Sequence, residues 1–293
     1  MDQAQQLRNI IKQQNKKQHL ARVITVTSGK GGVGKTNMSV NIAIQLSRLG
    51  KKVIILDADF GLANVEVMLG KRPRYNLADM IFGGKDINEI ICDGPEDIGF
   101  ISGGSGIKEL SNLSKDQISG IVNMMYELDS IADIIIIDTG AGISNAVIDM
   151  VLASSEVLLV TTPEPTSITD AYALLKTINK TPGFQSENIK IRMIGNRTLN
   201  LSDGYELYNK LNSVVGEFLD MNMEYLGAVP FDVNLTKAVM KQQPVSIIYP
   251  NTPAVKSIRS MAETLINMEH SEQKTMRMGL SGLFSKMFRN RKK

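Results

Sequence analysis

Short apolar runs recur along the chain, and the segments between them carry apolar residues at helical spacing. Continuous runs rich in isoleucine, valine and leucine are typical of strands that are buried on both faces of a sheet. Because such runs alternate with helical segments, we predict an α/β fold, a doubly wound and mostly parallel sheet with helices on both faces. The predicted strands are 23–26, 53–56, 98–101, 134–137, 157–160, 189–194 and 225–229, and the predicted helices are 37–49, 115–128, 143–152, 166–178, 205–221 and 253–268.

A glycine-rich segment, Ser-Gly-Lys-Gly-Gly-Val-Gly-Lys-Thr, joins the first predicted strand to the first predicted helix. From Gly29 to Lys35 and Thr36 it fits G-x-x-x-x-G-K-[ST] in the strand–loop–helix context that binds nucleotide phosphates. Glycines let successive backbone N–H groups turn toward phosphate oxygens, and the helix N-terminus adds its positive dipole end. We predict that Lys35 reaches the β- and γ-phosphates and that the Thr36 hydroxyl holds Mg²⁺. The predicted nucleotide-binding loop is Gly29, Lys30, Gly31, Gly32, Val33, Gly34, Lys35 and Thr36.

Acidic residues follow two of the predicted strands, at the edge where ligands of such sheets gather. Asp57 and Asp59 follow the strand 53–56, and Asp138 follows four successive isoleucines. A single carboxylate at the tip of a fully buried strand suits the shell of a nucleotide-bound magnesium ion. Gly142, a little further on, would let a backbone N–H approach the γ-phosphate, so this loop is predicted to sense that phosphate.

Composition and charge narrow the classes of function. The formal net charge is +3 over 293 residues, but both ends are basic and the body between them is acidic, which argues against a broad nucleic-acid surface on the body. Cys92 is the only cysteine, so no disulfide or all-cysteine cluster forms within one chain, and a reducing cytosol is expected. The first residues lack the apolar core of a signal peptide, and no apolar run is long enough to span a membrane.

The two ends divide the chain into three predicted parts: an arm (1–22), an ATPase domain (23–270) and a tail (271–293). The arm reads as a short polar helix, either ordered by a partner or a frayed terminus. The tail reads as a basic amphipathic helix, which favours an anionic membrane surface over a calmodulin-like partner, a nucleic acid or a solubilising role. Its predicted membrane face is Leu280, Leu283, Phe284, Met287 and Phe288.

The segment from Lys30 to Thr36, Lys-Gly-Gly-Val-Gly-Lys-Thr, resembles the deviant Walker A motif of the MinD/ParA ATPases. The resemblance implies a MinD-like P-loop NTPase that binds ATP, ADP and Mg²⁺, hydrolyses ATP slowly and dimerises with ATP. In that family the extra lysine, here Lys30, crosses the dimer interface and contacts the partner's nucleotide. Catalytic roles therefore fall on Lys30, Lys35 and Asp59.

Further site residues are implied by the same resemblance. On matching positions Asp59 positions the attacking water, Asp57 helps order the magnesium shell, and Asn64 is a polar switch I residue. Gly140 stands where most relatives have proline, so the geometry of the loop after Asp138 departs from the family pattern. The adenine base is expected to lie between two loops, with Asn196 and Arg197 in one and Pro230 in the other; guanine is not favoured because no Asn-Lys-x-Asp motif occurs.

The first residues of the arm resemble one branch of the family, the FlhG (FleN, YlxH) regulators of flagellar number and placement. The matching positions are Asp2, Gln3, Ala4, Leu7 and Arg8. In that branch the arm engages FlhF, a GTPase of the signal-recognition-particle type. The resemblance implies a cytoplasmic ATPase that binds the inner face of the cell membrane reversibly, with flagellar switch-complex proteins as further partners. A DNA-partition ATPase and a P-loop ATP-dependent small-molecule synthetase stay open as alternatives.

Overall fold

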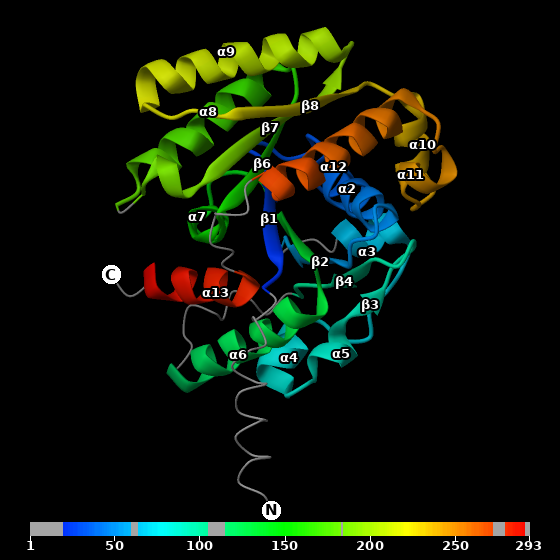
Figure 1. Cartoon of the computed structure of the whole chain (residues 1–293), viewed down its shortest axis with the longest axis vertical. Coiled ribbons are helices and arrows are strands. Elements are labelled where there is room, and N and C mark those ends of the chain that lie inside the picture. Colours follow the sequence, from blue (N-terminus) through cyan, green and yellow to red (C-terminus); the bar gives the residue numbers. More distant parts are fainter. Residues whose placement is uncertain (1–19, 60–63, 105–114, 183, 272–278, 291–293) are drawn as a thin grey trace, which may run out of the picture.

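A computed structural model of the chain describes residues 20–59, 64–104, 115–182, 184–271 and 279–290. Its centre is an eight-stranded sheet of order β3-β4-β2-β5-β1-β6-β7-β8 (Figure 1). Every neighbouring pair is parallel except the pair of β3 and β4. The predicted α/β class is thereby confirmed. The strands are β1 (Arg22–Thr27), β2 (Val53–Ala58), β3 (Cys92–Asp93), β4 (Gly99–Ile101), β5 (Ile134–Thr139), β6 (Glu156–Thr161), β7 (Lys190–Thr198) and β8 (Glu224–Pro230).

Helices cover both faces of the sheet (Figure 1). On one face α2 and α12 pack side by side, and on the other α6, α7, α8, α9 and α13 form the covering layer. The helices are α2 (Lys35–Arg48), α3 (Asn64–Leu69), α4 (Leu77–Gly83), α5 (Ile87–Ile90), α6 (Lys115–Ile131), α7 (Asn145–Ala153), α8 (Pro165–Lys180), α9 (Leu201–Leu219), α10 (Val233–Met240), α11 (Val245–Ile248), α12 (Pro253–Ser271) and α13 (Gly279–Asn290).

The isoleucine run of β5 shows why the strands read as continuously apolar. Ile134 and Ile136 belong to the core under α2 and α12, whereas Ile135 and Ile137 belong to the core under α6 and α13. Successive side chains of a strand point to opposite faces, so a strand covered on both faces needs apolar residues at every position. The periodicity therefore identified each of the long strands correctly.

The other short elements were missed by the same pattern, whereas the three-residue strand β4 falls within the predicted strand 98–101. Strand β3 has only two residues and no apolar run, and helices of fewer than nine residues give little periodic signal. Two of them carry a capping box instead: Asn76 with Asp79 at α4, and Asp86 with Glu89 at α5. These reciprocal caps are readable from sequence and would have indicated both helix starts.

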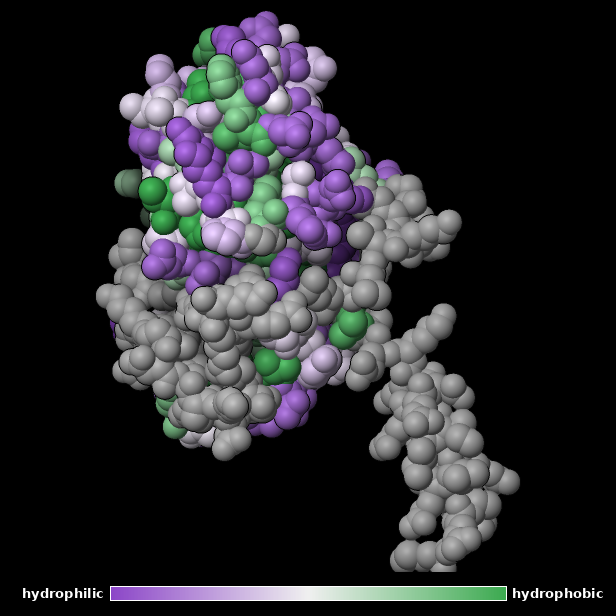
Figure 2. Space-filling model, turned by 90° about the vertical axis from the view of Figure 1, so that its left-hand side faces the viewer, coloured by the Kyte–Doolittle hydropathy of each residue, from purple (hydrophilic) through white to green (hydrophobic). Residues whose placement is uncertain are grey.

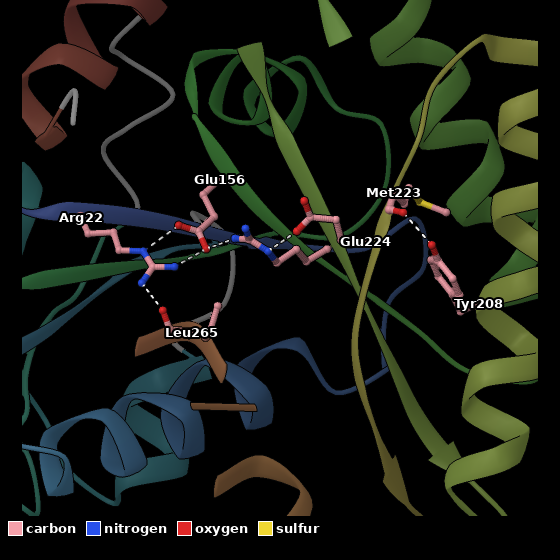
Figure 3. Close-up of polar contacts among 7 residues, drawn as sticks. Arg22, Glu156, Tyr208, Met223, Glu224 and Leu265 are labelled. Atoms are coloured by element: carbon pink, nitrogen blue, oxygen red, sulfur yellow. Dashed lines mark hydrogen bonds and ion pairs between the residues drawn. The ribbon is translucent and has the colours of Figure 1, made fainter. Parts of the chain in front are cut away.

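A chain of alternating charges, buried except at Glu224, lies at the edge of the sheet where the parallel strands begin (Figure 3). The Arg22 guanidinium donates to Glu156 Oε2 at 2.8 Å and Oε1 at 2.7 Å, and to the Leu265 carbonyl of α12 at 2.6 Å. Arg192, which is fully buried, donates to Glu156 and also to Glu224 at 2.7 Å. Buried charges are tolerated when they are paired in this way, so this edge is a closed structural network.

The predicted amphipathic tail helix is present as α13, and its apolar side faces the body of the protein. Helix α13 packs against α6, α7 and β1. The side chain of Phe288 and all the arm residues named above (Asp2, Gln3, Ala4, Leu7 and Arg8) lie outside the described part of the chain. The buried residues, called the apolar tail face below, are Leu280, Leu283, Phe284 and Met287, each at most 2% exposed.

The outer surface beside this layer has a mixed character. Figure 2 views the face formed on the left of Figure 1, and its coloured part shows small groups of hydrophobic residues between hydrophilic ones. None of the helices in the described ranges combines the length and the apolar character needed to cross a bilayer. The apolar tail face contributes almost nothing to this surface, because its residues are at most 2% exposed.

Candidate functional site

The glycine loop after β1 adopts a conformation that depends on glycine at several positions. Gly34 has φ +100° and opens helix α2, and Gly32 has φ +77°. A Cβ atom on Gly29 would lie 2.1 Å from the Asp170 backbone, and one on Gly34 would lie 2.4 Å from Asn196 Nδ2. These contacts leave no room for a side chain, so α8 and the end of β7 lie directly against the loop.

Lys35 and Thr36 begin α2 and face the carboxylate that ends β5. Thr36 Oγ1 donates to Asp138 Oδ2 at 2.6 Å, and Ser39 Oγ donates to Asp138 Oδ1 at 2.9 Å. Burial lowers the pKa of Lys35, while the carboxylates of Asp138 and Asp59 oppose that shift. Ser39 was not predicted from the sequence, although it lies one helical turn after Lys35 and so shares its face of the helix.

Asp57 and Asp138 are register neighbours on the adjacent strands β2 and β5. Asp57 accepts the backbone N–H groups of Asp59 and Val65, each at 3.1 Å. Burial, and then repulsion from Asp138, raises the pKa of Asp57 to about 7. Burial likewise raises the pKa of Asp138 to about 6, against the lowering effect of its two hydroxyl donors.

These two carboxylates fit a magnesium ion. Both are buried and both carry a raised pKa, and the Thr36 hydroxyl at the start of α2 donates to Asp138. A divalent cation would compensate their charge, and carboxylate and hydroxyl oxygens are ligands that Mg²⁺ accepts. Thr36, Asp57 and Asp138 could therefore hold such an ion, and their role as the metal set stays a prediction.

The loops after β2 and β5 approach each other. Asn64 Nδ2 donates to Asp59 Oδ2 at 2.9 Å, which fixes the carboxylate. A Cβ atom on Gly140 would lie 3.4 Å from Asp59 Oδ1, so the residue that replaces the expected proline adjoins the predicted catalytic acid. The Gly142 N–H donates to the Ser28 carbonyl at 2.9 Å, and its φ of +87° requires glycine. The two predicted switch segments thus meet beside the phosphate loop.

Lys30 lies on the outer side of the loop, where its ammonium group has intramolecular partners. It donates to Glu164 Oε2 at 2.9 Å and to Thr166 Oγ1 at 2.7 Å, at the start of α8. Lys30 holds the pKa of Glu164 below its usual value, with a smaller contribution from Arg197. Glu164 and Thr166 were not selected from the sequence, because they pair with a residue far away in the chain.

The predicted base-binding residues lie beside the loop and are already hydrogen-bonded. Asn196 Nδ2 donates to the Val33 carbonyl at 2.7 Å, and Asn196 Oδ1 accepts the Arg197 N–H at 2.9 Å. Arg197 is exposed and has φ +56°, which is uncommon for a residue with a side chain. The Phe231 N–H donates to the Thr198 carbonyl at 2.8 Å, so the loop at Pro230 adjoins that at Asn196. Adenine recognition by these residues stays a prediction.

Asp232, just after Pro230, adds a group that the sequence did not single out. Its Oδ1 accepts the Asn234 N–H at 2.8 Å and caps α10. Its other oxygen, Oδ2, is buried without a hydrogen-bond partner among the residues described. A buried carboxylate oxygen without a donor is costly, and this one lies just after Pro230, in one of the two loops predicted to bind the base.

Comparisons with known proteins find similar proteins over most of the chain. A ParA family model, described as NUBPL iron-transfer P-loop NTPase, matches residues 19–266. The chain is 40% identical over 245 residues to the antiactivator FleN of Pseudomonas aeruginosa, which covers 84% of this chain and 86% of that protein. It is 32% identical over 296 residues to the flagellum site-determining protein YlxH of Helicobacter pylori, covering 98% of each.

Solved structures agree in fold. The septum site-determining protein MinD of Pyrococcus horikoshii, in complex with Mg-ADP, superposes with a TM-score of 0.66 at 22% identity, covering 88% of this chain and all of that one. A ParA family ATPase of Chlorobium tepidum superposes with a TM-score of 0.67 at 21% identity, covering 84% of this chain and 99% of that one.

Proposed function

The chain belongs to the MinD/ParA family of P-loop ATPases, and from that premise we propose that it is an ATP-hydrolysing molecular switch. One observation carries the proposal. Lys35, the Thr36–Asp138 pair and the Asp59–Asn64 pair meet at a single edge of the sheet, around a loop that only glycines can form. Such a set supplies what phosphoryl transfer needs, namely positioned cations, a metal shell and a residue that orients water.

Each residue of the site has a distinct role in the proposed hydrolysis. Lys35 holds the β- and γ-phosphates, and Asp59, fixed by Asn64, positions the attacking water. Thr36 and Asp138 would hold the magnesium ion, and Asp57 would support its shell. When bound, that ion would neutralise charge on the phosphate oxygens. Gly142 reports whether the γ-phosphate is present, because its N–H can exchange the Ser28 carbonyl for a phosphate oxygen.

The proposed ATP-dependent dimer requires Lys30 to change partners. Its present ion pair with Glu164 is partly exposed, at 35% and 53% of the two side chains, and such pairs are worth at most about 1 kcal/mol. A phosphate oxygen of a second protomer's nucleotide is a stronger acceptor for an ammonium group. Lys30 is therefore held in the monomer by a contact that a dimer can replace.

Membrane binding by the tail is the second part of the proposal. We divide the chain into the arm (1–22), the ATPase domain (23–270) and the tail (271–293). The apolar tail face is buried against α6, α7 and β1, so the tail helix must leave the body before it can enter a lipid surface. One tail would bind weakly, whereas two tails on an ATP-bound dimer gain avidity. The protein would thus be cytoplasmic and reach the inner face of the membrane reversibly.

The biological output we propose is control of flagellar number and placement. The support is similarity to FleN and YlxH, which covers most or all of the chain. The FlhF GTPase, through the arm, and flagellar switch-complex proteins are the proposed partners. The arm residues lie outside the described part of the structure, so this partner rests on the sequence match alone.

Iron transfer, the activity in the family model's description, is not part of the proposal. The chain has a single cysteine, Cys92, so two copies supply two thiolates and fall short of an all-cysteine four-iron cluster. Within the described residues no group of three or more His, Cys, Asp or Glu side chains is arranged to hold a metal.

The test measures association and membrane binding in parallel. Light scattering of the full chain with ATP, with ADP and without nucleotide should give a dimer only with ATP. Sedimentation with vesicles that contain anionic phospholipid should follow the same nucleotide dependence, and a chain truncated after Gln273 should dimerise but stay in the supernatant. One association state under all three conditions would contradict the switch, and equal sedimentation of both chains would contradict the tail.

A further inference from the structure

The first turn of α13 is held by one carboxylate of α6. Asp129 Oδ1 accepts the Leu280 N–H at 2.6 Å. Asp129 Oδ2 accepts the Ser281 N–H at 3.0 Å and the Ser281 hydroxyl at 2.6 Å. Free N–H groups at a helix start normally find a cap in the preceding residue, but Met278 has no side-chain oxygen. Asp129 therefore caps the tail helix from a different helix.

Gly279 is shaped for this contact. Its φ is +65°, and a Cβ atom at this position would lie 2.4 Å from Asp129 Oδ2 and 2.8 Å from Asp129 Cγ. Any other residue would push the helix start away from the carboxylate. The glycine that raises the cost of ordering the tail also lets its first turn approach α6 closely.

Asp129 can fix the position of the tail helix on the body, whereas the apolar tail face cannot. Apolar contacts are not directional, so by themselves they would tolerate a tail helix that is shifted along the surface of the body. Hydrogen bonds from two successive N–H groups and a hydroxyl to one carboxylate fix a single position. Asp129 is 1% exposed, so a partly withdrawn tail would leave a buried charge without these donors, which is unfavourable.

We propose that Asp129 is the positioning residue that locks the tail helix onto the body and makes its release an all-or-none step. The proposal rests on the proposed function, since it concerns how the tail becomes available to a lipid surface. A fully released tail exposes Asp129 to water, which solvates the carboxylate. The carboxylate accepts three hydrogen bonds from the docked tail and would be hydrated once the tail is released, whereas a partly withdrawn tail provides neither set in full.

The first test measures the lock without lipid. Hydrogen–deuterium exchange of residues 280–287 in the full chain compares the wild type with Asp129→Ala and with Glu127→Gln, which removes an exposed charge from the same helix. Asp129→Ala should exchange about tenfold faster or more, as expected for a lost hydrogen bond to a charged group. Glu127→Gln should match the wild type. Equal protection in all three proteins would overturn the proposal.

A second variant breaks the same contact from the tail side, in case Asp129→Ala fails to fold. Gly279→Ala leaves the carboxylate in place and should give the same fast exchange, with unchanged ADP affinity as the sign of an intact body. With ADP, both variants should sediment with phosphatidylglycerol vesicles while Glu127→Gln does not. If the two variants exchange fast but no form binds vesicles, not even the wild type with ATP, the lock is supported and the membrane role is refuted. Wild-type binding with ATP, combined with unchanged exchange in Gly279→Ala, refutes the lock alone.

Discussion

The phosphate-loop edge and the contact between α13 and α6 each centre on a fully buried carboxylate, and they satisfy it in different ways. Asp138 is 0% exposed and accepts two side-chain hydroxyls, from Thr36 and Ser39 of the helix it faces. Asp129 is 1% exposed and accepts two backbone N–H groups and a hydroxyl from α13. The first is held by rigid core elements and the second by a terminal helix.

The difference bears on whether a ligand could be added at each site or part of the protein could leave it. Burial raises the pKa of Asp138 to about 6 even though its two hydroxyl donors and Lys35 act to lower it, so an added metal ion would stabilise the charged carboxylate. The donors of Asp129 belong to a helix that could leave as one piece. A ligand would therefore be added at the first site, whereas part of the protein would be removed at the second.

The substitution expected to have the largest effect at the phosphate-loop site is Asp59→Ala. Without the carboxylate that Asn64 orients, hydrolysis should fall about 10²–10⁴-fold, the usual contribution of a positioned general base. ATP binding should persist, so phosphate release assays should decline while calorimetry with ATP stays normal. An unchanged turnover number would remove Asp59 from the catalytic role. Without nucleotide, hydrogen exchange of residues 280–287 should not change in this variant.

Lys35→Ala should weaken nucleotide binding at the same edge. Lys35 is 8% exposed and is predicted to contact the phosphates. Loss of a charge-assisted contact costs about 1.5–3 kcal/mol, or about 10–150-fold in Kd. Calorimetry with ADP measures this directly. Lys30→Ala is the matched control, since it should keep ADP affinity and lose only the ATP-dependent dimer. Equal ADP affinity in wild type and Lys35→Ala would mean that the phosphates bind elsewhere.

Removing residues 274–293 tests the other region. Each residue of the apolar tail face contributes about 1.5–3 kcal/mol as an upper bound when it is buried. A net loss of about 3 kcal/mol would lower Tm by about 6–12 °C for a domain of this size. Thermal unfolding monitored by circular dichroism gives the shift, and ADP affinity should stay normal. A Tm equal to that of the full chain would mean that α13 adds nothing to the body.

The smallest expected effect comes from Glu164→Gln. The Lys30–Glu164 pair is partly exposed, so its loss is worth at most about 1 kcal/mol, or about fivefold. Because the lysine is freed for a second protomer, the ATP concentration needed for dimerisation should fall by up to that factor. Light scattering across an ATP titration measures it, with Glu187→Gln as an exposed control distant in sequence. A higher ATP requirement would instead place Glu164 in the dimer contact itself.

The amino-acid sequence by itself determined the long strands, the phosphate loop and the acids at the strand ends. These are local features: Gly29 to Thr36 reads as one motif, and the four isoleucines before Asp138 can only be a strand covered on both faces. Parallel strands bring their carboxyl ends to one edge, which placed Asp57 next to Asp138, two of the residues predicted to hold the metal.

Tertiary structure alone decided which distant partners these residues have. Glu164 lies 134 positions from Lys30, Leu280 lies 151 positions from Asp129, and Asn196 lies 163 positions from Val33. The amphipathic pattern of the tail predicted an apolar face but could not tell whether lipid or protein covers it, because both offer the same apolar environment. Packing of α13 on α6, and the one carboxylate that caps it, depend on how the chain folds back on itself.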